Sequence, residues 1–73
     1  MRSIRLKGTR VQIEDEIWFS DIEQGVTCGE IEEIYESGGD FYFVVRVEGA
    51  DSAYVVLKQN AYLSETDLLE DYL

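Results

Sequence analysis

Residues 41–48, FYFVVRVE, constrain the fold of this chain most strongly, because apolar and polar positions alternate along them. The odd and even positions form two faces: Phe41, Phe43, Val45 and Val47 on one, and Tyr42, Val44, Arg46 and Glu48 on the other. Period-two alternation of β-branched and aromatic residues is typical of a β-strand. The segment therefore predicts a strand and a fold rich in β-structure.

Three further segments extend this prediction. Residues 53–58, AYVVLK, follow the turn EGADS and predict a hairpin with residues 41–48. Residues 10–20, RVQIEDEIWFS, alternate except at Asp15, which predicts a first strand with a kink. Residues 29–37 also fit a helical stripe, but their short span between glycines favours a strand with a bulge at Glu32 and Glu33. SGGD is then the turn that leads into residue 41.

The C-terminal residues LSETDLLEDYL carry helix signals. Ser64 is a good N-cap residue, and Asp67 stands three positions later, as a short variant of the capping-box residue. Acidic residues in a first helical turn also interact favourably with the helix dipole. We therefore expect a short helix at this end of the chain.

Together these segments predict a mostly β protein, a single small, partly open barrel of four to five antiparallel strands with a short C-terminal helix. A chain of 73 residues has room for one core only, because it buries about 60% of the surface exposed on unfolding. We expect one domain over residues 1–73. Residues 1–9 form a basic N-terminal arm or first strand, residues 10–63 the barrel body, and residues 64–73 the helix.

The charge is unevenly distributed along the chain. The formal net charge is −10, yet Arg2, Arg5, Lys7 and Arg10 all lie in the first ten residues. Residues 11–73 therefore hold sixteen carboxylates against two basic side chains, a net charge of −14. Such a body is repelled by nucleic-acid phosphates and anionic lipid heads and is steered towards basic partners. We expect no direct nucleic-acid binding and no membrane association.

The residue types present argue against catalysis and cofactors. The chain has no histidine, so a Ser-His or Cys-His nucleophile has no base, and the His and Cys ligands of a structural zinc site are missing. No calcium-loop motif is present, and carboxylate acid–base chemistry needs a pocket that a domain this small rarely builds. Cys28 is the only cysteine, so no internal disulfide forms. We predict a non-enzymatic, cofactor-free protein and a cytoplasmic location.

The order DEIWF, GEIEEI, GDFYFVV resembles the pattern of Src-homology-3-like small barrels, including those of many small phage-borne proteins. The resemblance covers about residues 10–63. It carries over no binding residues, because the proline-reading aromatic groove of peptide-binding members has no match here. Small acidic phage-borne proteins often inhibit host defence enzymes, and they include anti-CRISPR and anti-restriction proteins that imitate nucleic acid. The resemblance thus implies an inhibitor acting in a phage-infected bacterial cell.

The candidate site is the acidic run at residues 29–41, GEIEEIYESGGDF, with nearby aromatic residues. Its predicted partner-binding residues are Glu30, Glu32, Glu33, Glu36, Asp40, Trp18, Tyr42 and Tyr54. One interpretation is a solvated strand face that blocks edge-to-edge aggregation. Another is an acidic surface that imitates phosphate spacing and binds a protein with a basic nucleic-acid-binding surface. A third is an interaction module of a phage particle or larger assembly that binds through its aromatic patch. In this interpretation the protein can also bind a second copy of itself as a homodimer.

Overall fold

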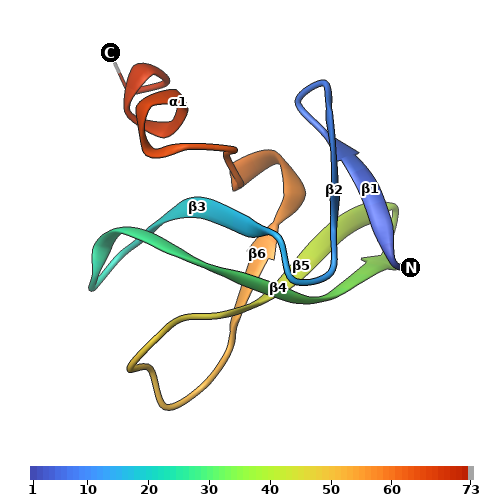
Figure 1. Cartoon of the computed structure of the whole chain (residues 1–73), viewed down its shortest axis with the longest axis horizontal. Coiled ribbons are helices and arrows are strands. Elements are labelled where there is room, and N and C mark those ends of the chain that lie inside the picture. The colour runs from blue at the N-terminus through green and yellow to red at the C-terminus, as the bar shows by residue number, and fades with distance from the viewer. Residues whose placement is uncertain (73) are drawn as a thin grey trace.

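The computed structural model describes residues 1–72 and confirms a mostly β fold with a short C-terminal helix (Figure 1). The elements in chain order are β1 (Ser3–Leu6), β2 (Thr9–Gln12), β3 (Glu16–Asp21), β4 (Gly25–Ser37), β5 (Asp40–Arg46), β6 (Tyr54–Leu57), the 3-10 helix η1 (Lys58–Asn60) and α1 (Glu65–Glu70). Neither helix in this part of the chain has the length and hydropathy needed to cross a membrane.

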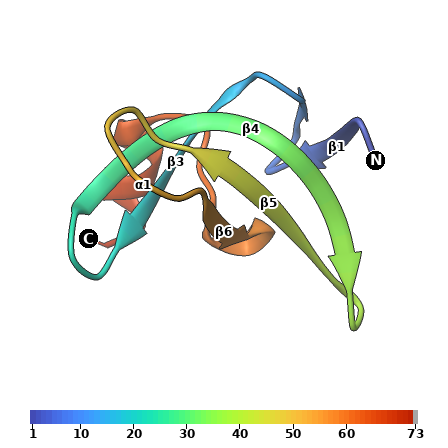
Figure 2. The same ribbon diagram turned by 90° about the horizontal axis from the view of Figure 1, so that it is seen from below.

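The strands form two antiparallel sheets. Strands β3, β4, β5 and β6 pair in sequence order as a meander that curls into a half-barrel, and β1 pairs with β2 in a separate hairpin. Figure 2 shows β4 as a long arch, with β5 running along part of it. The N-terminal segment, expected to be an arm or a first strand, thus forms a hairpin of its own. Residues 1–72 therefore contain six strands, where four to five were expected. The kink expected at Asp15 separates β2 from β3, and its carboxylate accepts a hydrogen bond of 2.9 Å from the Gln12 amide.

A register shift in the β4–β5 ladder, between Ile31 and Glu33, confirms the bulge predicted from the sequence. An ordinary strand would place Ile31 and Ile34 on opposite faces, since side chains alternate. The extra residue at the bulge brings both isoleucines to the inner face, where both are buried. The predicted turn is also present, because Gly38 and Gly39 both take positive φ angles between β4 and β5.

The half-barrel is closed by the chain that follows β6. Trp18 in β3 and Tyr62 exchange two backbone hydrogen bonds of 2.8 Å, which joins the outer edge of β3 to this segment. The tip of the β1–β2 hairpin is attached to the same place. The Lys7 ammonium donates to the carbonyl oxygens of Ala61 at 2.7 Å and Gln59 at 3.1 Å. It also lies 4.2 Å from the ring centroid of Tyr62. Partial burial by these contacts lowers the pKa of Lys7.

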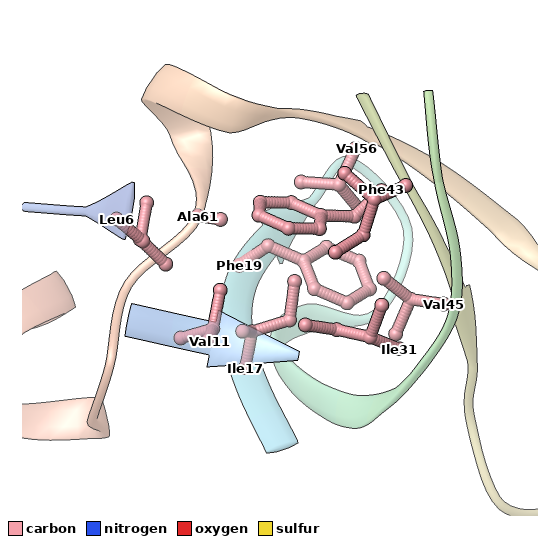
Figure 3. Packing of buried hydrophobic residues seen from close by; sticks show 10 residues of the cluster. Leu6, Val11, Ile17, Phe19, Ile31, Phe43, Val45, Val56 and Ala61 are labelled. Atoms are coloured by element: carbon pink, nitrogen blue, oxygen red, sulfur yellow. The ribbon is translucent and has the colours of Figure 1, made fainter. Parts of the chain in front are cut away.

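The core fills the inner face of the half-barrel (Figure 3). Its buried residues come from all six strands and from the segment after η1: Leu6, Val11, Ile17, Phe19, Ile31, Ile34, Phe43, Val45, Val56 and Ala61. The hairpin contributes Leu6 and Val11, so it is part of the packed domain. The predicted helix cap is confirmed, because the Ser64 hydroxyl accepts a 3.1 Å hydrogen bond from the Asp67 amide.

Candidate functional site on the outer face of the sheet

Two rows of side chains cross the outer face of β4, β5 and β6. The pairing register places Tyr35, Tyr42 and Leu57 in one row and Glu33, Val44 and Val55 in the other. Directly opposed residues of antiparallel strands point to the same face of a sheet. The intervening row, Ile34, Phe43 and Val56, is buried in the core. The first two rows therefore face away from the core.

Five of these six outer residues are apolar or aromatic, and we call them the outer patch: Tyr35, Tyr42, Val44, Val55 and Leu57. The two tyrosine rings stack, with centroids 5.3 Å apart and an interplanar angle of 19°. Val55 is 60% exposed, and the other four are half-buried. Stacked aromatic residues beside exposed aliphatic ones are typical of the central part of a protein interface.

All five carboxylates of the predicted acidic site are exposed, but they do not form one straight row. Glu33 shares a row with the outer patch, and Asp40 lies opposite Ser37, beyond the stacked tyrosines. Glu30 lies at the other end, opposite Arg46. Glu32 belongs to the bulge, and Glu36 lies opposite Phe41, at an inner-face position near the end of β4. Glu30, Glu33 and Asp40 therefore border the outer patch along the sheet, whereas Glu36 belongs to the opposite face.

The three predicted aromatic residues are placed differently. Tyr42 belongs to the outer patch. The prediction that Tyr54 shares its face is wrong, because the hairpin register sets Tyr54 opposite the buried Val45. The Tyr54 ring packs against the core, with its centroid 5.4 Å from that of Phe19. Trp18 is half-buried on β3 opposite Cys28, outside the two rows of the outer patch.

The electrostatics of this face are dominated by carboxylates. Arg46 is the only basic residue between residues 11 and 57. It forms an exposed ion pair with Glu30, and the hydrogen bond and charge of Glu30 raise the pKa of the guanidinium. An exposed pair of this kind adds little to stability because solvent screens it. Because Arg46 is paired with Glu30, its positive charge does not offset the other acids around it.

The sequence argument missed four residues of this site: Tyr35, Val44, Val55 and Leu57. Each was recognisable as a strand residue, but its position beside the others depends on how three strands align. A one-residue change of register turns a whole strand over. The sequence did indicate that segments 41–48 and 53–58 pair with each other. The turn EGADS between them does not specify which residues lie opposite one another.

The side chains of this face are carboxylates, tyrosine rings and aliphatic groups, which can make non-covalent contacts. Among residues 1–72, no three His, Cys, Asp or Glu side chains gather in a group able to hold a metal ion. Burial raises the pKa of the Cys28 thiol, and the charge and hydrogen bond of Glu16 raise it further. A thiol with a raised pKa is a weak nucleophile at neutral pH, because the thiolate is the reactive form.

Three comparisons with known proteins gave no match. No protein-family model matches the chain, and neither a curated protein nor a solved structure matches it at a significant level.

Proposed function

We propose that this protein is a non-enzymatic binding protein whose outer face docks on the basic nucleic-acid-binding surface of another protein. The observation that carries the proposal is the combination of a stacked tyrosine pair with carboxylates on both sides of it. Tyrosines supply rigid contact area at an interface, and the carboxylates match a basic partner in charge. Neither feature requires a catalytic group.

The charge of the whole body supports the same kind of partner. Residues 11–73 carry a net charge of −14, which attracts basic surfaces over distances of about 8–10 Å at ordinary ionic strength. A basic channel that binds phosphates is the commonest strongly positive surface on a nucleic-acid enzyme. Occupation of that channel by carboxylates excludes the nucleic acid.

The resemblance to Src-homology-3-like phage-borne proteins extends the proposal to a biological setting. We place the protein in the cytoplasm of a phage-infected bacterium, as an inhibitor that blocks a host defence nuclease by nucleic-acid mimicry. Anti-CRISPR and anti-restriction proteins are inhibitors of this kind. The partner is expected to be a protein, with no direct contact between this chain and nucleic acid.

The test is affinity capture from a nuclease-treated bacterial lysate at low and high salt, followed by competition with duplex DNA or RNA for the purified captured protein. We expect recovery of a nucleic-acid enzyme that falls with salt, and displacement by nucleic acid. Replacement of Glu32 and Glu33 by Gln and of Asp40 by Asn should weaken binding at least tenfold, because three attractive charges are lost.

The matched control replaces Glu23, Glu65 and Glu70 by Gln, which removes the same charge from exposed positions outside the site. This control should change affinity less than threefold. Equal effects of the two triple variants, or a captured protein that nucleic acid fails to displace, would contradict the mimicry proposal.

The outer patch also favours a second candidate function, that of an accessory module in a phage particle or larger assembly. Its contact would be carried by Val44, Val55 and Leu57 together with the tyrosines, and a homodimer is one form of it. This function predicts binding that is insensitive to salt and is lost in a Val55→Lys variant. The two candidates are separated by the salt dependence of the captured complex.

A further inference from the structure

A groove lies where β4 and β5 separate, beside the loop that joins β5 to β6. It has a volume of about 790 Å³, and its walls are residues 24–28 on one side and residues 47–54 on the other. A second hollow of about 650 Å³ continues from it and shares Cys28, Val47 and Glu48 among its lining residues. In Figure 1 the first half of β4 and the loop after β5 diverge from one another.

Gly29 marks the closed end of the groove. A Cβ atom at this position would overlap the carbonyl oxygen of Arg46 and lie 2.7 Å from Cγ1 of Val45. The backbone of β5 therefore leaves no space for a side chain here, and only glycine permits the contact. Beyond this point β5 ends at Arg46, while β4 extends back to Gly25.

The separation of the strands leaves one edge of β4 open towards the groove. The first half of β4, residues 25–29, pairs with β3 on its other edge, whereas pairing with β5 begins at Glu30. Within residues 1–72, no strand pairs with residues 25–29 on the side that faces the groove. An open strand edge presents N–H and C=O groups, which an extended polypeptide can use for main-chain hydrogen bonds.

The lining is apolar and acidic. Val26 is 38% exposed, and Cys28, Val47 and Tyr54 are half-buried. The charged residues that line the two hollows are Glu16, Glu30, Glu48, Asp51 and Arg46. Because Arg46 is paired with Glu30, three carboxylates remain without a basic partner in the lining.

We infer that this groove binds an extended basic segment of a partner protein, which adds as a strand along residues 25–29 of β4. The main-chain groups of the open edge hold the segment, the exposed apolar side chains accept alternate residues, and Glu16, Glu48 and Asp51 attract its basic side chains. The same carboxylates repel nucleic acid and acidic segments. This inference does not depend on the outer patch, because none of the five residues of that patch lines the groove.

The test uses a nine-residue peptide of alternating Lys and Val as the probe, titrated into the 15N-labelled protein and followed by NMR and by amide hydrogen exchange. We expect chemical-shift changes at residues 25–29 and 47–53, with amide exchange in the first group slowed at least tenfold. A matched Glu and Val peptide should not bind. A Lys and Val peptide with two internal prolines should bind at least fivefold more weakly, since proline lacks the N–H donor.

Two variants with the same charge change complete the test. Val26→Lys places a positive charge in the groove and should weaken binding of the basic peptide at least tenfold. Ile22→Lys places it on a fully exposed position of the β3–β4 turn and should change binding less than threefold. Equal binding of the basic and acidic peptides, equal effects of the two variants, or absence of binding would overturn the inference. Shifts confined to Tyr35, Tyr42 and their neighbours would also overturn it and would instead support the proposed function.

Discussion

The two halves of β4 have different roles in the same continuous strand. Its second half, residues 30–37, pairs with β5 and contributes Ile31 and Ile34 to the core. Its first half, residues 25–29, pairs with β3 only and leaves the exposed Val26 and the half-buried Cys28 beside a groove. The halves meet at Gly29, where β5 leaves no space for a side chain on β4.

This difference shows how one strand of a 73-residue domain supplies core side chains in one half and lines a groove with the other. Each half pairs with one neighbouring strand over most of its length, the first half with β3 and the second half with β5, and the two core isoleucines lie in the second half. Where the neighbouring strand departs, the same strand keeps its extended shape but exposes one edge. Strand edges and clefts of this kind are common sites for recognition of other chains.

The largest expected effect is at the junction of the halves. Gly29→Ala should destabilise the fold by about 3 kcal/mol or more, because the new methyl group overlaps the backbone of β5 and the two strands must separate. Urea denaturation followed by tryptophan fluorescence measures this loss. Gly8→Ala in the β1–β2 turn, where a Cβ meets no neighbour but φ is positive, is a milder reference. A Gly29→Ala protein as stable as the natural one would show that the strands are not held at this point.

A smaller effect separates the two halves directly. Ile34→Val removes one methyl group from a fully buried side chain of the second half and should cost about 0.5–1.5 kcal/mol. Val26→Ala in the first half removes more carbon, yet it should cost less than Ile34→Val, because the Val26 side chain is partly in solvent already. The same denaturation experiment compares them. The reverse order would mean that the first half of β4 is the more important one for stability.

The smallest effect concerns the thiol of Cys28 in the first half. Its raised pKa leaves less thiolate than an ordinary cysteine has at the same pH, so alkylation by iodoacetamide near pH 8 should be slow. Glu16→Gln removes a negative charge that raises this pKa, so the rate-against-pH profile should move to lower pH. It should remain above that of free cysteine, because burial, the larger cause, is unchanged. An unaltered profile would show that Glu16 does not act on the thiol.

Much of the local structure was predictable from the sequence. The alternation of residues 41–48, the bulge at Glu32 and Glu33, the turn at Gly38 and Gly39, and the Ser64 cap all correspond to observed features. Each depends on residues close together in the chain, for which spacing and side-chain type are sufficient evidence. The N-terminal arm was harder, because its basic residues do not show whether it pairs with itself or with the barrel.

The candidate site was predictable only in part. The exposure of the acidic side chains followed from their charge, but their arrangement around Tyr35 and Tyr42 did not, since it requires the β4–β5 register and the bulge together. The misplacement of Tyr54 has the same origin. An alternating segment shows that two faces exist, and the side chains of the neighbouring strand then decide which face is buried.

The sequence by itself determined that this chain forms short strands, a capped helix and an acidic surface, because strand alternation, turn residues and charge act locally. The tertiary structure alone decided where β4 and β5 separate, which tyrosines meet, and which edge of β4 stays open. These features result from contacts between strands that pack around one small core. The close contact of Gly29 with β5 is one of them, and no local pattern in the sequence reveals it.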